Sequence, residues 1–164
     1  MAVSLLDMES RKRAILFLLG SGADVGELQE LAQDLRVEGM IRFVERVPHA
    51  DVPRYIAACD CGVIPLPDLR EWQVSSPLKL MEYLAMEKPV IATRIPPHEL
   101  GTDGVILTSA EPKSLATAMG ELLEMPPEER ERRGREGRRL AYEHSWDRQA
   151  ARLLGFFAML GIRT

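Results

Sequence analysis

The stretch VSSPLKLMEYLAMEKPVIATR, at residues 74–94, combines a polar loop, a capped helix and an apolar strand. Ser75 or Ser76 can cap the helix with its hydroxyl, and Pro77 suits the first helical position because its missing N–H is not needed there. The free N–H groups and the dipole of such a helix start favour an anion, and Lys79 adds a full positive charge. The stretch therefore predicts a phosphate-binding helix start that leads into a strand.

The same helix carries a charged pair near its opening end. Glu82 follows Lys79 by three residues, which puts the two side chains at neighbouring positions on one helix face. On the residues alone a second interpretation stays open, in which this is an ordinary capped helix with a Lys–Glu pair on its surface.

Length, composition and net charge indicate which class of protein this chain belongs to. A length of 164 residues predicts one domain, residues 1–164, and 46% hydrophobic residues are ordinary for a globular protein. The net charge of −4 does not favour nucleic acid or an anionic membrane as partner. The N-terminus lacks a signal-peptide pattern and no apolar run is long enough to span a bilayer, so we expect a cytoplasmic protein.

The spacing of the two cysteines predicts buried thiols rather than a metal site. Cys59 and Cys61 are separated by one residue and have none of the spaced Cys or His partners that a zinc site needs. We therefore expect two buried thiols and no metal site.

Short apolar runs alternate with helical patterns along most of the chain. Strands are predicted where apolar residues form runs too short for a buried helix, at Ile15–Gly20, Ile41–Val47, Cys61–Pro67, Pro89–Thr93 and Gly104–Ser109. Between them we expect a short helix at Ala2–Ala14, a helix at Gly26–Arg36, a helix capped by Asp51, a loop DLREWQ at residues 68–73 and the helix of residues 74–94.

This alternation predicts an α/β fold, with a Rossmann-like and mostly parallel sheet covered by helices on both faces and joined by right-handed crossovers. Ligands of such sheets bind at the loops that follow the carboxyl ends of the strands. Here those loops are GSGAD at residues 20–24, residues 46–50, residues 68–76 and IPPHE at residues 95–99.

The chain ends in a helical tail whose middle part, residues 126–145, is heavily charged. Glu and Arg are mixed there, which favours a solvated helix face with ion pairs over an RNA-binding helix. None of the three histidines, His49, His98 and His144, has a partner at a spacing that would indicate a catalytic triad. We therefore expect them to be surface or loop histidines. Trp72 has two open interpretations, stacking on a base or sugar and packing on the scaffold.

Five segments, in this order, resemble the C-terminal donor-binding domain of group-one retaining glycosyltransferases with the GT-B fold. They are FLLGSG (17–22), IRFVERV (41–47), CDCGVIPLP (59–67), SSPLKLMEYLAMEKPVIAT (75–93) and YEHSW (142–146). The resemblance covers nearly the whole chain. It implies that this chain binds a nucleotide-diphosphate sugar as donor substrate, and we expect no metal and no other cofactor.

The resemblance also assigns roles to residues of the helix start. Glu82 matches the second glutamate of the family's Glu, seven residues, Glu signature, which implies that it accepts hydrogen bonds from the ribose hydroxyls. The backbone N–H groups of Ser75, Ser76 and Leu78 are implied to face the diphosphate, with Lys79 as a phosphate partner. Val74 stands where the family has its first glutamate, so the sugar-contacting role is vacant at that position.

Two turns complete the implied donor site. The turn Gly20, Ser21, Gly22 matches the family's Gly-rich turn, where glycine allows the backbone to approach a ligand closely. Val47 and Pro48 match the turn that usually lodges the nucleotide base. For both turns a plain connection between elements is an open alternative.

Two parts of the family's usual enzyme have no counterpart in this sequence. The domain normally begins with a further strand, whose loop clamps the donor phosphates, and it follows an N-terminal acceptor-binding domain. We therefore expect the isolated chain not to transfer sugar. A sheet without that strand exposes two unpaired edges, so we also expect a dimer or an assembly with another chain.

Two other functions are kept as alternatives. A truncated descendant of this fold could be a non-catalytic interaction module that oligomerises or pairs with another chain. A flavodoxin-like or response-regulator-like domain would show the same alternation of elements, but the acidic cluster expected at the end of its first strand is missing here.

Overall fold

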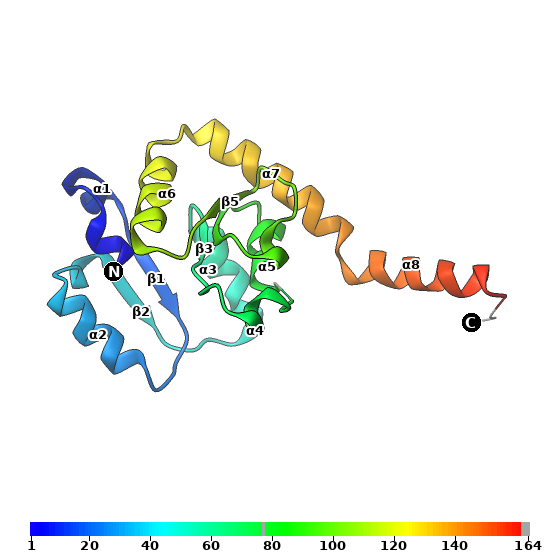
Figure 1. The fold of residues 1–164 in the computed structure, drawn as a ribbon, viewed down its shortest axis with the longest axis horizontal. Coiled ribbons are helices and arrows are strands. Elements are labelled where there is room, and N and C mark those ends of the chain that lie inside the picture. The colour runs from blue at the N-terminus through cyan, green and yellow to red at the C-terminus, as the bar shows by residue number, and fades with distance from the viewer. Residues whose placement is uncertain (77, 162–164) are drawn as a thin grey trace.

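The computed structural model describes residues 1–76 and 78–161 of the chain. Within these residues, five parallel strands form two separate sheets. One sheet pairs β1 (Leu16–Leu19) with β2 (Ile41–Val44), and the other has the order β3 (Gly62–Ile64), β4 (Val90–Thr93), β5 (Val105–Thr108). The predicted α/β fold with parallel strands and a helical tail is confirmed (Figure 1).

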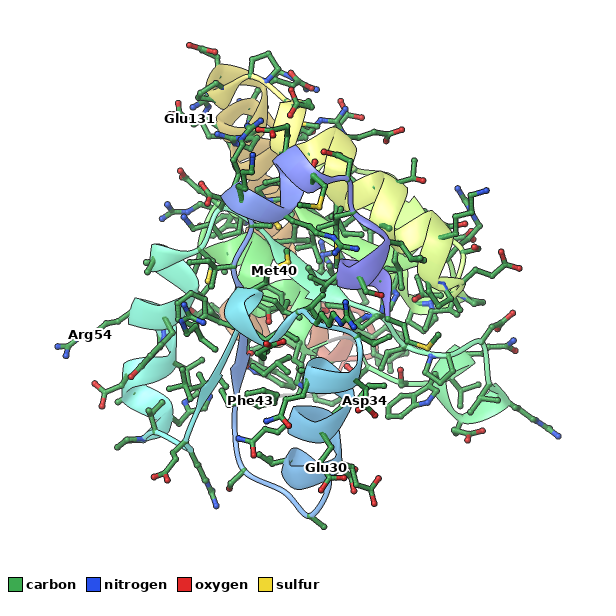
Figure 2. All side chains as sticks on the ribbon, turned by 90° about the vertical axis from the view of Figure 1, so that its left-hand side faces the viewer. Glu30, Asp34, Met40, Phe43, Arg54 and Glu131 are labelled. Atoms are coloured by element: carbon green, nitrogen blue, oxygen red, sulfur yellow. The ribbon has the colours of Figure 1, made fainter. Side chains whose placement is uncertain are left out.

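Helices and short 3-10 turns connect the strands and cover them. They are η1 (Ala2–Leu5), α1 (Met8–Arg13), α2 (Val25–Asp34), η2 (Glu38–Met40), η3 (His49–Asp51), α3 (Val52–Ala58), α4 (Arg70–Gln73), α5 (Leu78–Ala85), η4 (Pro96–His98), α6 (Pro112–Glu124), α7 (Pro127–Glu143) and α8 (Trp146–Met159). Figure 2 shows the charged side chains of Glu30 and Asp34 on α2, while Met40 lies in the buried interior.

The N-terminal segment differs from the single helix expected at Ala2–Ala14. It forms η1 and α1, because the carboxylate of Asp7 accepts hydrogen bonds from the N–H groups of Glu9 and Ser10, each at 2.9 Å, and so starts a new helix. The Ser10 hydroxyl also donates to Asp7, at 2.6 Å, and this bond is the main cause that lowers the pKa of the carboxyl. The break between the two elements thus follows from one capping residue.

Two further local expectations need correction. The segment DLREWQ, expected to be a loop, contains the short helix α4. Asp51 stands at the N-cap position of α3, but its carboxylate does not cap the helix. It lies instead 3.5 Å from the guanidinium of Arg54, because the two residues are three apart on the first turn.

Helix α6 lies across both sheets and joins them. Its residue Ala116 belongs to a buried cluster that includes Val3 and Met40, against which Leu16 of β1 packs. Its residue Ala118 belongs to a second cluster that includes Ile91 of β4. The two sheets therefore share one covering helix, although no strand links them within the described residues.

Helix α7 packs on α5 through glycines. A Cβ atom placed on Gly134 would lie 2.0 Å from the carbonyl oxygen of Glu87, and one placed on Gly137 would lie 2.5 Å from a methyl carbon of Leu84. Gly104, before β5, approaches Gly137 equally closely, since its Cβ would lie 2.7 Å from the Gly137 Cα. These glycines allow backbones to touch where any side chain would separate them.

The end of α5 has an unusual backbone for its residue type. Glu87 has a φ of 57°, in the left-handed region that favours glycine. The N–H of Lys88 donates to the Tyr83 carbonyl at 3.1 Å and that of Glu87 donates to Leu84 at 3.0 Å, which is the Schellman arrangement of a helix end. The Glu87 carboxylate also pairs with Arg138 of α7 at 2.8 Å.

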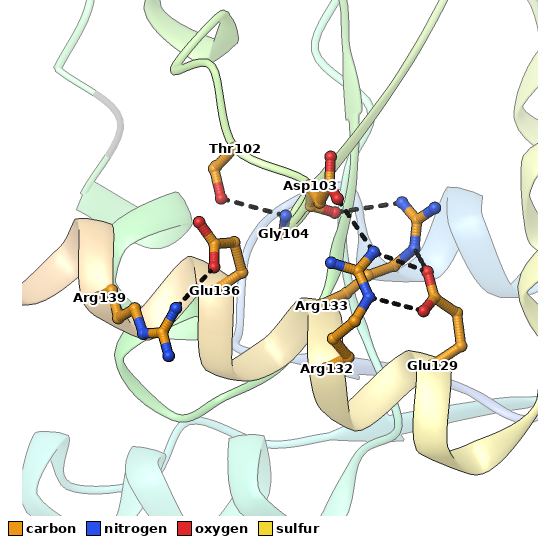
Figure 3. Close-up of polar contacts among 8 residues, drawn as sticks. All are labelled: Thr102, Asp103, Gly104, Glu129, Arg132, Arg133, Glu136 and Arg139. Carbon is orange, nitrogen blue, oxygen red and sulfur yellow. Dashed lines mark hydrogen bonds and ion pairs between the residues drawn. The ribbon is translucent and has the colours of Figure 1, made fainter.

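The outer face of α7 carries the ion pairs predicted from its mixed charges. The Glu129 carboxylate accepts from Arg132 at 2.7 Å and from Arg133 at 2.8 Å, and Arg132 also reaches Asp103 at 2.9 Å (Figure 3). The hydrogen bond from Arg132 is the largest cause that lowers the pKa of Glu129, to about 2. The network ties α7 to the turn that precedes β5.

Helix α8 extends away from the strands (Figure 1). None of its residues is buried, and it begins beside Tyr142, whose ring lies 4.8 Å below the guanidinium carbon of Arg148. No helix among the described residues is both long enough and apolar enough to cross a membrane.

Candidate functional site

The loops that follow β1, β2 and β3 lie along one edge of the molecule, the lower edge in Figure 1. This is the arrangement expected for parallel strands, whose carboxyl ends meet at the same edge. Most residues predicted to bind a ligand stand in these loops or at the start of α5. The edge is therefore the candidate site.

The turn after β1 has a backbone that requires glycine. Gly20 has a φ of 146°, and its N–H donates to the Val44 carbonyl at 2.9 Å, which extends the pairing of β1 with β2 by one residue. A Cβ placed on Gly20 or on Gly22 would meet no atom within 4 Å, and Ser21 between them is exposed. The space beside this turn is thus open to an approaching ligand.

The turn after β2 approaches helix α5. Val47 is half-buried and Pro48 is exposed, with the Pro48 carbonyl accepting from the Asp51 N–H at 2.9 Å to begin η3. Next to it, the Nε2 atom of His49 lies 4.0 Å from a carboxylate oxygen of Glu82. Two segments far apart in the sequence, the β2 exit and α5, therefore meet at this edge.

The polar residues before α5 make local hydrogen bonds. The hydroxyl of Ser75 donates to the Trp72 carbonyl at 2.9 Å, and the N–H of Leu78 donates to the Ser76 carbonyl at 2.9 Å. Leu78 could donate to a ligand only if that bond opened. Pro77, expected at the first helical position, lies outside the described residues.

Lys79 and Glu82 both stand on the exposed side of α5. The Glu82 side chain is 45% exposed, so it reaches solvent while its helix is anchored by the fully buried Leu80 and Leu84. In residues 1–76 and 78–161 no ion pair joins Lys79 to Glu82. The side chain that approaches Glu82 is that of His49, which the sequence did not predict.

Val74 and Trp72 flank this start of α5. Val74 is 83% exposed, and its side chain can neither donate nor accept a hydrogen bond. Trp72, on α4, is 37% exposed, so part of its ring faces solvent at the same edge. A ligand beside the start of α5 would meet an apolar contact at Val74 rather than a carboxylate.

His98 fits the expectation of a surface or loop histidine only as a residue of a connecting turn, because it is not at the surface. It is 1% exposed in the short turn η4, and its Nδ1 lies 2.7 Å from the Thr93 carbonyl oxygen. A carbonyl only accepts, so Nδ1 carries the proton and holds the loop after β4 in place. His49 and His144 are exposed, as expected of surface histidines.

The cysteines lie at the opposite ends of the strands from these loops. Burial raises the pKa of the Cys61 thiol to about 12, and the Cys59 thiol, also raised in pKa by burial, lies 3.2 Å from the Tyr55 carbonyl oxygen. Among the described residues, no three or more His, Cys, Asp or Glu side chains are grouped so as to hold a metal ion.

Two shallow hollows lie away from the candidate site. One, of about 280 Å³, is bordered by Leu6 and by Lys113 of α6. The other, of about 240 Å³, is bordered by Pro89 and Arg130 at the amino ends of the strands. Neither hollow is lined by a residue of the strand-end loops, so the candidate site is defined by its side chains and backbone turns.

Comparison with known proteins decides the family. The model of the family described as glycosyl transferases group 1 matches residues 2–125. This chain belongs to that family. A D-inositol 3-phosphate glycosyltransferase from Corynebacterium urealyticum is 28% identical to it over an alignment of 146 residues, and the match covers 86% of this chain and 33% of the relative.

Solved structures support the same fold for this group 1 glycosyltransferase chain. A sucrose-phosphate synthase from Thermosynechococcus elongatus aligns with a TM-score of 0.78 and 20% identity, over 97% of this chain and 42% of that one. Anabaena HepE, in complex with UDP and glucose, aligns with a TM-score of 0.72 and 20% identity, over 94% of this chain and 42% of that one. The chain thus spans about a third to two fifths of the length of these proteins.

Proposed function

We propose that this chain binds a nucleotide-diphosphate sugar at its strand-end loops and provides the donor half of a retaining glycosyltransferase. The observation that carries the proposal is the approach of the β2 exit to α5, with His49 at 4.0 Å from Glu82. It brings together the turn proposed for the base and the carboxylate proposed for the ribose. Membership in the glycosyltransferase family, and UDP in one solved relative, support the choice of ligand.

Each group in the site has a distinct proposed role. The carboxylate of Glu82 accepts hydrogen bonds from the ribose hydroxyls, and Lys79 together with the first turn of α5 faces the diphosphate. The open turn at Gly20 and Gly22 lets the backbone approach the donor. Donors fixed in place before reaction stabilise the charge that develops on the departing diphosphate, which is the electrostatic part of catalysis.

The proposal further holds that the isolated chain binds donor without transferring sugar. The chain spans only part of its relatives, and the acceptor would be held by a polypeptide other than these residues. Bond breaking with retention at the anomeric carbon would follow only when that second part is present. We also propose that binding needs no metal ion, so excess EDTA should leave donor affinity unchanged.

Titration calorimetry with UDP-, GDP- and ADP-sugars tests donor binding. We expect heat from one of the three, and a loss of affinity of about tenfold or more in Lys79→Ala, because a charged hydrogen bond to phosphate is removed. Glu82→Gln should weaken binding less, since the amide keeps one acceptor. Lys113→Ala and Glu121→Gln, exposed changes on α6, serve as matched controls.

Two results would contradict the proposal. One is the absence of heat with all three nucleotide sugars, which would favour the alternative of a non-catalytic module that pairs with another chain. The other is binding that Lys79→Ala and Lys113→Ala weaken equally, because the site would then lie elsewhere.

A further inference from the structure

The ring of His98 is buried, yet one of its two nitrogens has no partner among the described residues. The side chain is 1% exposed, and its Nδ1 donates to the Thr93 carbonyl oxygen at 2.7 Å. No hydrogen bond joins its Nε2 to another described residue, whereas no buried side-chain nitrogen or oxygen in that part of the chain is without a partner. Nε2 is therefore the atom through which this ring reaches solvent.

The position of the proton decides what Nε2 can bind. Because Nδ1 holds the proton in the bond to Thr93, Nε2 of the neutral ring carries a lone pair and only accepts hydrogen bonds. The oxygens of a diphosphate are acceptors too, so they cannot pair with it. A hydroxyl group can donate to it. The opening at His98 is thus suited to a ligand that bears hydroxyl groups.

The His98 ring lies at the same edge as the candidate site. Strand β4 pairs in parallel with β3, with Ala92 opposite Ile64, so the two strands end together. At that end the Thr93 hydroxyl donates to the Ile64 carbonyl at 3.5 Å. The turn η4, which contains His98, packs against α4, which carries the partly exposed Trp72. Nε2 therefore opens at the strand ends, next to the helix that precedes α5.

The turn that carries His98 is held in place on both sides of the residue. The His98 N–H donates to the Ile95 carbonyl at 2.9 Å, and the His98 carbonyl accepts from the Leu100 N–H at 3.0 Å. Arg94 and Glu99, which flank the turn, form an ion pair at 3.3 Å. An acceptor that is fixed before binding loses little conformational freedom when a ligand arrives.

We propose that Nε2 of His98 accepts a hydrogen bond from a hydroxyl group of the donor sugar. The inference rests on the proposed function, in which Glu82 binds the ribose, the turn after β2 binds the base and Lys79 faces the diphosphate. The sugar is the part of the donor that these groups leave without a partner. His98 thus selects the sugar, while the other residues hold the nucleotide.

Titration calorimetry isolates the contribution of the sugar. Each of the UDP-, GDP- and ADP-sugars is compared with UDP, GDP or ADP alone, so that the ratio of the two dissociation constants reports on the sugar. We expect His98→Asn to weaken binding of the nucleotide sugar by about tenfold and to leave binding of the nucleoside diphosphate unchanged. The asparagine amide can still donate to the Thr93 carbonyl from the position of Nδ1, but it has no atom at the position of Nε2.

A second histidine provides the matched control. His144, at the end of α7, has its Nδ1 at 3.0 Å from the Leu140 carbonyl oxygen, and it stands outside the strand-end loops. His144→Asn therefore changes the same kind of local contact at a distant place. It should leave the dissociation constants of the nucleotide sugar and of the nucleoside diphosphate unchanged.

Analogues of the donor identify the hydroxyl group. A set of nucleotide sugars, each lacking one sugar hydroxyl, is titrated into the unaltered chain and into His98→Asn. The analogue without the paired hydroxyl should bind the unaltered chain about tenfold more weakly than the parent donor does. It should bind His98→Asn as tightly as the parent does, because the two losses share one hydrogen bond.

Nitrogen NMR tests the same contact without altering His98. In the chain labelled with ¹⁵N-histidine, the Nε2 resonance of His98 should move on addition of the nucleotide sugar and stay in place with the nucleoside diphosphate. The chain has three histidines, so His49→Gln and His144→Asn assign the signals. This measurement decides the matter if His98→Asn does not fold.

The results that overturn the inference differ from those that overturn the proposed function. His98→Asn that weakens both ligands equally, or neither, overturns the role of Nε2 while donor binding stands. An Nε2 resonance that the nucleotide sugar does not move has the same meaning. The absence of heat with all three nucleotide sugars and their nucleoside diphosphates contradicts the proposed function itself, and the inference with it.

Discussion

The packing of α7 against α5 predicts that adding one methyl group at Gly134 destabilises the protein. A Cβ at this position would lie 2.0 Å from the Glu87 carbonyl oxygen and 2.7 Å from its carbon, whereas contacts under 3.0 Å are not tolerated. The helix would have to move by about 1 Å, and the obstacle is backbone, which no rotamer change can relieve.

The size of the effect follows from two opposing contributions. Overpacking of this kind costs about 3 kcal/mol. Replacing glycine by alanine inside a helix raises the free energy of unfolding by about 1 kcal/mol, because alanine has the higher helix propensity. Gly134→Ala should therefore lower the free energy of unfolding by about 2 kcal/mol, which for a chain of this size lowers Tm by roughly 4–8 °C.

Thermal and denaturant unfolding followed by circular dichroism measures the change. Gly120→Ala, in the middle of α6, is the matched control, because a Cβ there meets no atom within 4 Å. It should leave stability unchanged or raise it by up to about 1 kcal/mol. A Gly134→Ala variant at least as stable as the unaltered protein would refute the packing described for α5 and α7.

Three further predictions follow from other parts of the structure. Glu87→Gly should be more stable than Glu87→Gln by about 1 kcal/mol in the same unfolding assay, because both lose the ion pair with Arg138 but only glycine relieves the left-handed backbone; equal stability would contradict this. Since the pKa of Glu129 is lowered to about 2 from 4.5, its stabilising effect is present above pH 4.5 and is lost as pH falls toward 2. The difference in free energy of unfolding between the unaltered chain and Glu129→Gln should therefore disappear as pH falls from 4.5 to 2. At pH 7, 0.5 M salt should make this difference smaller. A difference that does not depend on pH would count against the ion-pair network of Figure 3. At pH 8 iodoacetamide should label Cys61 in the native protein far more slowly than after denaturation, as followed by mass spectrometry, because burial raises the pKa of that thiol to about 12; rapid native labelling would show that the thiol is accessible.

Much of the fold could be predicted because local patterns and tertiary burial agree. The five apolar runs became five strands, each shortened at one or both ends, and the run at Pro89–Thr93 became β4, whose four residues are all buried. Alternation with helices was enough to predict parallel pairing. The helix at Ala2–Ala14 was wrong in detail because Asp7 caps a second helix, a signal visible in the sequence as Asp followed three residues later by Ser.

What sequence reasoning missed depends on contacts between distant segments. The charged run of α7 predicted ion pairs, but not that Gly134 and Gly137 form a surface for α5, although two glycines three apart inside a helix are an available signal. His98 was expected to be a surface or loop histidine, and the sequence did not show that its ring is buried with Nδ1 at 2.7 Å from the Thr93 carbonyl oxygen. Neither contact is encoded in the local pattern.

At the candidate site the contacts between the predicted residues could not be read from the sequence. Lys79 and Glu82 both stand on the exposed side of α5, whereas their spacing of three residues predicted only that they share one helix face. The approach of His49 to Glu82 joins residues 33 positions apart and depends on how the β2 exit is folded over α5. The donor-binding roles of these residues stay predictions until the titrations are done.

The close packing at Glu87 has a consequence for how α5 can move. Its C-terminal end is held by the backbone of Gly134 and by the contact of Leu84 with Gly137, whereas its N-terminal end faces solvent at Leu78. Backbone contacts hold the Glu87 end, whereas the first turn is held by the buried side chain of Leu80, so we expect a displacement of α5 to be a tilt about the Glu87 end. Eight residues rise about 12 Å, so a tilt of about 5° moves the first turn by about 1 Å, enough to lengthen or shorten hydrogen bonds to a bound phosphate.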